Sequence, residues 1–128
     1  MSVLASFLAV AFGGALGACA RYSVSLWLAS NSTRFPFGTL AANLAGALLA
    51  GIIVTVLMSR GPTTSPVHLL LVTGFLGSFT TLSAFSIETI RLVQSGAVMS
   101  ALVYVLVSIV GALLFALMGG WVARLFVV

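Results

Sequence analysis

Four long apolar runs follow one another along the chain, separated by short stretches rich in Gly, Pro, Ser and Thr. They cover residues 3–28, 37–58, 67–87 and 97–118. Each reaches the roughly 20 residues that a helix needs to cross a hydrocarbon core of ~30 Å. None of the runs alternates strictly between apolar and polar positions, so barrel strands are excluded and helices remain the way to satisfy a backbone in lipid. The pattern predicts an all-α membrane protein with one domain, residues 1–128, of four transmembrane helices.

Composition supports a multi-pass protein of the cell (inner) membrane. Apolar residues make up 62% of the chain and charged residues 5%, whereas soluble domains carry about 25% charged residues. The net charge of +4 comes from single, scattered arginines. Because nucleic-acid binders gather their basic residues in a patch or stripe, we expect no nucleic-acid partner here.

The arginines are divided almost evenly between the two sides of the membrane. With four spans, Arg60 and Arg124 fall on the side of the N-terminus, and Arg21, Arg34 and Arg91 fall on the other. Orientation follows the Lys/Arg bias of the connecting segments, so a bias this small predicts insertion in both orientations and pairing of two copies as an antiparallel homodimer. The alternative is that one arginine, or the first span, still fixes a single orientation.

The third run is unusually rich in glycine and hydroxyl residues over residues 74–86. Gly and Thr are poor helix formers, and a break near the middle, from Gly77 to Thr80, is one interpretation. Irregular backbone at membrane depth exposes carbonyls that can bind cations. The other interpretation is an intact helix whose hydroxyls bond back to carbonyls one turn earlier.

Asn43 is a carboxamide within an uncharged run, one helical turn after Thr39. Tyr104 and Ser108 share a face of the fourth run in the same way. A buried amide without a partner is costly, and polar residues in membrane spans are candidates for function. These side chains can line a polar track for a small anion, since Asn offers two N–H donors and no net charge. They can also serve as hydrogen-bonded contacts between helices.

Glu88 is the only acidic residue and lies at the end of the third run. Buried carboxylates need partners, and Arg21 and Arg91 are the candidates for an ion pair. A proton-coupling acid is the alternative. His68 is the only histidine, and no metal-ligand spacing, nucleophile motif or phosphate loop accompanies it. We therefore expect the protein not to be an enzyme.

Three motifs occur in order along nearly the whole chain. The first matches GG-x-x-GA-x-x-RY at Gly13, Gly14, Gly17, Ala18, Arg21 and Tyr22. The second matches P-x-GTL-x-x-N-x-x-G at Pro36, Gly38, Thr39, Leu40, Asn43 and Gly46. The third matches GF-x-G-x-x-TT-x-S-x-FS-x-E at Gly74, Phe75, Gly77, Thr80, Thr81, Ser83, Phe85, Ser86 and Glu88. With these motifs the chain resembles the Fluc (CrcB) family of fluoride channels.

The resemblance implies a passive fluoride channel that exports cytoplasmic fluoride, built as a dual-topology antiparallel homodimer with two pores. It also implies a structural sodium ion at the dimer interface, held by the backbone carbonyls of Gly77 and Thr80. The pore residues carried over from the family are Asn43, Phe85, Ser83, Tyr104, Ser108 and Thr39. Arg21 and Glu88 are carried over as structural or vestibule residues.

The chain departs from the family pattern at Leu82, where members often have a second pore aromatic, and at Ala84 and Ala112, where they often continue the polar track. The expected polar track is therefore thinner. A phenylalanine in a membrane span is usually a packing residue, so Phe85 enters the pore by resemblance alone. Two other classes remain open: a small dual-topology, proton-coupled multidrug transporter, and a membrane assembly subunit that transports nothing.

Overall fold

The computed structural model describes residues 2–29, 35–59 and 65–127. It forms a helical bundle that begins with α1 (Val3–Ala29) and α2 (Phe37–Met58). The third span is composite, and α6 (Val98–Val127) completes the bundle. Four helices in the described residues are long and apolar enough to cross a membrane, which confirms the predicted all-α membrane fold.

The third span contains four short elements. They are α3 (Pro66–His68), the π-helical stretch η1 (Leu69–Leu76), α4 (Gly77–Phe79) and α5 (Leu82–Gln94). Its helix continues past residue 87, where the apolar run ends, because Glu88 and Arg91 keep helical hydrogen bonding although they end the run of apolar side chains. The fourth helix likewise continues past residue 118 to Val127.

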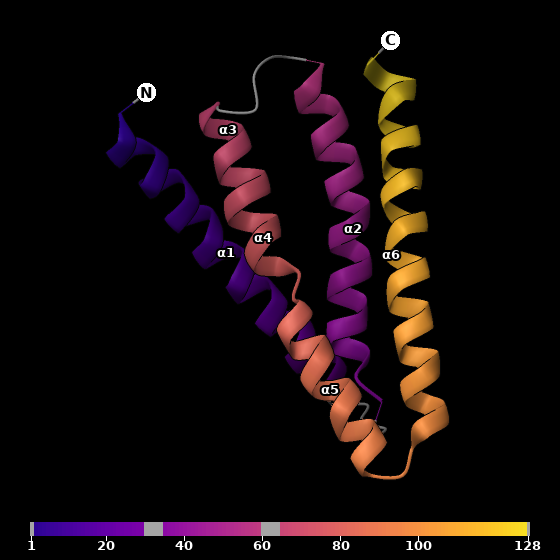
Figure 1. Ribbon diagram of the computed structural model, residues 1–128. Helices are drawn as coiled ribbons and strands as arrows, with labels where there is room; N and C mark the ends of the chain where they lie inside the picture. Colours follow the sequence, from indigo (N-terminus) through magenta and orange to yellow (C-terminus); the bar gives the residue numbers. More distant parts are fainter. Residues whose placement is uncertain (1, 30–34, 60–64, 128) are drawn as a thin grey trace.

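A break interrupts the third span at Thr80 and Thr81, as Figure 1 shows between α4 and α5. Both residues are extended, with φ/ψ of −87°/151° and −149°/123°. Thr81 begins α5 as its N-cap, because its hydroxyl oxygen accepts a hydrogen bond from the backbone N–H of Ala84 at 3.3 Å. The predicted break is confirmed, although it starts at the end of the predicted segment and Gly77 remains helical.

The helices pack in two pairs. α1 lies against η1 and α4, and α2 lies against α6, with the two termini at the same end of the bundle (Figure 1). Glycines permit the close approach. A β-carbon on Gly17 would overlap the carbonyl oxygen of Phe75, and one on Gly51 would overlap the carbonyl oxygen of Ala116. Small residues at helix contacts therefore set the spacing of both pairs.

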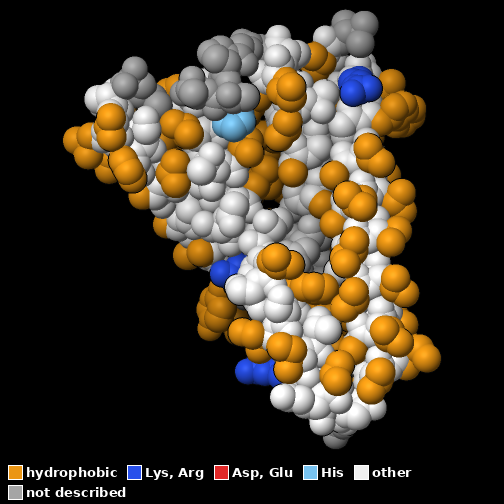
Figure 2. Space-filling view, in the orientation of Figure 1, with side chains coloured by type: hydrophobic (Ala, Val, Ile, Leu, Met, Phe, Trp, Pro, Cys, Tyr) orange, Lys and Arg blue, Asp and Glu red, His pale blue; other side chains and the backbone are white. Residues whose placement is uncertain are grey.

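Figure 2 shows apolar side chains spread over the whole face, with few charged groups among them. Large side chains such as Phe7, Trp121 and Leu117 are well exposed along the helices. A water-soluble protein does not leave an apolar surface of this extent uncovered. The protein is therefore a multi-pass membrane protein whose outer surface faces lipid.

Candidate ion pathway

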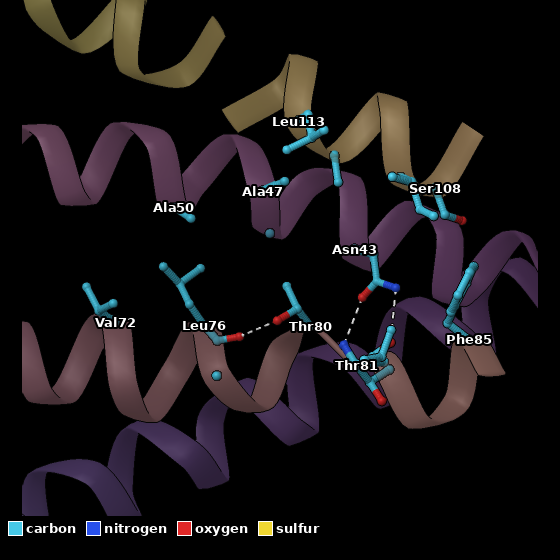
Figure 3. A pocket seen from close by; sticks show the side chains of 15 residues that line it. Asn43, Ala47, Ala50, Val72, Leu76, Thr80, Thr81, Phe85, Ser108 and Leu113 are labelled. Atoms are coloured by element: carbon cyan, nitrogen blue, oxygen red, sulfur yellow. Dashed lines mark hydrogen bonds between the residues drawn. The ribbon is translucent and has the colours of Figure 1, made fainter. Parts of the chain in front are cut away.

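A cavity of about 590 Å³ lies where the break of the third span faces α2 and α6. Figure 2 shows this face hollowed near its middle, and Figure 3 shows the lining side chains. Among the described residues, none of those that line the cavity is charged. The lining residues are Asn43, Gly46, Ala47, Ala50, Val72, Leu76, Gly77, Thr80, Thr81, Leu82, Phe85, Ser108, Ile109, Ala112 and Leu113.

Asn43 lies at the cavity and bonds to the backbone of the break (Figure 3). Its Nδ2 donates to the carbonyl of Thr81 at 3.1 Å, and its Oδ1 accepts from the Thr81 N–H at 2.8 Å. The break removes both Thr81 groups from regular helical bonding, and the carboxamide replaces that bonding. Sequence reasoning missed this role because a backbone partner leaves no signal in the sequence. One N–H of the two on Nδ2 is still available to a ligand.

Ser108 places a hydroxyl in the same cavity from α6 (Figure 3). The residue is only 7% exposed, and its Oγ is buried without a hydrogen-bond partner among the described residues. Buried hydroxyls are nearly always paired. Ser108 is therefore a vacant donor in a lining that is otherwise mostly apolar.

Glu88 accepts hydrogen bonds from two hydroxyls. Thr39 Oγ1 donates to its Oε1 and Tyr104 OH donates to its Oε2, both at 2.7 Å. The predicted ion pair of Glu88 with Arg21 or Arg91 is not found among the described residues, so this prediction was wrong. The carboxylate accepts hydrogen bonds from hydroxyls on α2 and α6 instead. The structure thus brings Thr39, Tyr104 and Glu88 together in one network.

Two phenylalanine rings flank Tyr104 in this network. The ring of Tyr104, which has no exposed surface, lies 5.2 Å from that of Phe85 and 5.6 Å from that of Phe35, between centroids. The Phe35–Tyr104 pair is close to perpendicular, an arrangement that aromatic rings favour. Sequence reasoning did not select Phe35, which precedes α2 and carries no motif of its own.

Arg21 lies within α1, inside the predicted first span. Its Nε donates to the carbonyl of Ser78 at 3.1 Å, just before the break. Ser83 is exposed, and its hydroxyl shares a hydrogen bond of 3.1 Å with that of Thr81. The predicted vestibule and pore residues at these positions therefore both adjoin the break.

The three departures from the family pattern fall in or beside the cavity. Leu82 is 76% exposed at its edge, and Ala112 lines its wall. Ala84 follows on α5 and is half-buried. None of them offers a polar side chain to the cavity. Two arginines of the predicted charge distribution, Arg34 and Arg60, lie outside the described residues.

Together, these features define a small multi-pass membrane protein with uncharged donors around a cavity at a helix break. The family described as CrcB-like protein, Camphor Resistance (CrcB), matches residues 8–120. The chain belongs to this family.

Curated relatives agree over most of the chain. The fluoride-specific ion channel FluC of Bordetella petrii is 47% identical over 114 residues, covering 89% of this chain and 88% of that protein. That of Chloroflexus aurantiacus is 41% identical over 122 residues, covering 94% and 97%. That of Paracoccus denitrificans is 44% identical over 121 residues, covering 93% and 94%. These names describe ion channels, in agreement with the expectation that the protein is not an enzyme.

Proposed function

We propose that this protein is a passive fluoride channel through which cytoplasmic fluoride leaves the cell. The observation that carries the proposal is the buried, unpartnered hydroxyl of Ser108 in the same cavity as the carboxamide of Asn43. An anion in the cavity would supply the acceptor that the hydroxyl lacks. The relatives' names, which specify fluoride, support the choice of anion.

Uncharged donors suit the passage of a small and strongly hydrated anion. Conduction requires binding that is strong enough to replace water and weak enough to permit release. Asn43 and Ser108 offer hydrogen-bond donors without the deep well that Lys or Arg would create. The ring edge of Phe85 carries partial positive charge, so it can face an anion without trapping it.

An antiparallel homodimer with two pores fits the exposed face of the break. Gly77 lines the cavity and is exposed at the depth of the apolar spans, and the break takes away the Thr81 N–H that its carbonyl would accept in a continuous helix. Polar groups that face hydrocarbon without partners cost several kcal/mol each. A second copy covering this face would remove that cost, and the small difference in arginine number between the two sides favours its inverted insertion.

The carbonyls at the break fit the sodium ion that the family implies. In a continuous helix the N–H groups of Thr81 and Ala84 would bond to the carbonyls of Gly77 and Thr80, but here they bond to the side chains of Asn43 and Thr81. The Ser78 carbonyl between them accepts from Arg21. Carbonyl oxygens are suitable ligands for a hard cation. Gly77 and Thr80 would hold the ion, and its positive charge would favour anions in the neighbouring cavity.

The alternatives considered from the sequence gain no support here. A proton-coupled multidrug transporter needs a membrane-embedded acid free to exchange with a cationic substrate, and Glu88 is bonded to Thr39 and Tyr104. An assembly subunit has no use for the vacant Ser108 hydroxyl.

Fluoride release from liposomes tests the proposal. Vesicles containing the purified protein are loaded with potassium fluoride, and valinomycin is added so that potassium can balance the charge. We expect an external fluoride electrode to record rapid release, while vesicles loaded with potassium chloride keep their chloride. Retention of fluoride in protein-containing vesicles would contradict the proposed function.

A further inference from the structure

The π-helical stretch η1 lies with its backbone against α1 and leads into the break through α4. A β-carbon on Gly13 would overlap the carbonyl oxygen of Leu70, and one on Gly17 would overlap that of Phe75. Both glycines are buried. π-Helices are rare, appear mostly as single turns and are frequent at functional sites. A π-helical stretch of eight residues next to the break therefore points to a role for this contact.

The spacing of the two contacts accounts for the π-helical geometry. Gly13 and Gly17 are four residues apart, which places them on one face of an α-helix. Leu70 and Phe75 are five apart, and in an α-helix of 3.6 residues per turn they would lie about 140° from each other around the axis. Hydrogen bonds between residues five apart bring them to the same side. Along this contact η1 therefore holds one residue more than α1.

Both residues of the proposed sodium site bond directly to η1. The backbone N–H of Gly77 has the carbonyl of Val72, five residues earlier, as one acceptor. The N–H of Thr80 donates to the Leu76 carbonyl at 3.1 Å, and its hydroxyl donates to the same oxygen at 2.9 Å. We propose that α1 fixes η1 in its π-helical register, and that η1 thereby positions the carbonyls of Gly77 and Thr80 for sodium. This inference rests on the proposed function and deepens it.

Arg21 extends the contact of α1 as far as α4. It follows Gly17 by four residues, and its Nε donates to the carbonyl of Ser78 at 3.1 Å. Ser78 lies between Gly77 and Thr80 in sequence, so α1 holds the third span both before the proposed sodium site and within it. The direction of the two carbonyls therefore depends on how η1 and α4 are seated against α1.

A role in packing alone predicts a different outcome from a role in positioning. If the α1 glycines only allow helices to pack, then side chains placed there lower the stability of the protein and leave its sodium affinity unchanged. If they position the carbonyls, the affinity itself falls. Altering a group that orients metal ligands typically costs roughly 10- to 100-fold in metal affinity.

The contact between α2 and α6 supplies a matched control for each α1 glycine. A β-carbon on Gly14 would lie 3.2 Å from a hydroxyl and 3.9 Å from a backbone carbonyl oxygen of the third span. One on Gly120 would lie 3.3 Å from a hydroxyl and 3.8 Å from a carbonyl oxygen of α2. Gly17 and Gly51 form a more severe pair, because a β-carbon on either would overlap a carbonyl oxygen of the facing helix.

Sodium-dependent thermal stability tests the inference. Protein purified without sodium is titrated with sodium chloride, against N-methylglucamine chloride of equal concentration, and its melting temperature is measured in detergent. A ligand of the folded state raises this temperature once its concentration exceeds the dissociation constant. We expect Gly14→Ala and Gly17→Ala to need roughly 10- to 100-fold more sodium than the natural protein. Gly120→Ala and Gly51→Ala should melt lower at every sodium concentration but respond from the natural concentration onward.

A sodium response that is unchanged in both α1 variants, or shifted equally in their controls, overturns the inference and leaves the proposed function intact. If sodium does not stabilise the natural protein, the sodium site fails and the inference fails with it, while fluoride release from vesicles still tests the channel. Where Gly17→Ala does not fold, the comparison of Gly14→Ala with Gly120→Ala decides, because small shifts of a hydroxyl relieve the crowding in both.

Discussion

The carboxamide of Asn43 and the backbone of Thr81 hold each other through two reciprocal hydrogen bonds, of 3.1 and 2.8 Å. This pair joins α2 to the break in the third span and satisfies both peptide groups that the break releases at Thr81. The same amide lines the main cavity. One side chain thus stabilises the irregular backbone and lies at the proposed pathway.

Asn43→Ala should destabilise the protein. It leaves the N–H and carbonyl of Thr81 without partners, and each such buried group costs about 1–3 kcal/mol. We expect a clear fall in the melting temperature of the protein in detergent, measured by fluorescence-detected size-exclusion chromatography after heating. Gln94→Ala, at the exposed end of α5, is the matched amide control. Equal melting temperatures for the two variants would show that the Asn43–Thr81 pair contributes nothing to the break.

Ser108→Ala should leave the stability of the protein unchanged but slow fluoride efflux. Its hydroxyl has no partner among the described residues, so removal leaves no group unpaired and stability should be kept. If the hydroxyl donates to fluoride, its loss removes about 0.5–1.5 kcal/mol of binding, and vesicle efflux should slow by roughly twofold to tenfold. Ser86→Ala, exposed on α5, should release fluoride at the natural rate. Natural efflux from Ser108→Ala would remove this residue from the pathway.

Phe85→Ile should slow fluoride efflux while the protein remains folded and of unchanged size in detergent. Isoleucine keeps the apolar volume beside Tyr104 but has no positive ring edge for an anion. Phe12→Ile, on the exposed face of α1, is the control and should not change efflux. If both variants release fluoride at the same rate, Phe85 is a packing residue only.

Dual insertion can be tested at Ser59, which follows α2 at the membrane end shared with the termini. In a Cys19→Ala background, Ser59→Cys should react with an impermeant maleimide from outside intact cells in about half of the molecules, as near-zero orientation bias predicts. The remainder should react only after permeabilisation. Labelling confined to one side would contradict the antiparallel homodimer.

The fold was largely predictable because each span is recorded locally in the sequence. α2 covers Phe37–Met58, the limits of its apolar run. The Gly and Thr residues that weaken a helix left a break and an intact helix as two interpretations, and the family resemblance favoured the break. Its position was less so, because Thr80 and Thr81 leave helical geometry where Asn43 offers replacement bonds, and this contact joins residues distant in sequence.

The sequence indicated which residues belong to the candidate site, but not which hydrogen bonds join them. Asn43, Ser108, Thr39 and Tyr104 stood out as polar groups in apolar runs. The partners of Glu88 did not, because Thr39 precedes it by 49 positions and Tyr104 follows by 16. The nearby Arg91 seemed the natural partner in sequence, yet the packing of α2 and α6 against α5 supplies two hydroxyls first. Phe35 had no signal beyond its place before Pro36.

The central claim is that uncharged donors around the break conduct fluoride passively and selectively. A reversal potential tests it most directly, measured across a planar bilayer containing the protein with sodium fluoride on one side and sodium chloride on the other. The account predicts a current that reverses near the fluoride equilibrium potential and follows it as fluoride is varied, with no shift when chloride is varied. A reversal potential that follows chloride or sodium, or the absence of current under a fluoride gradient, would contradict it.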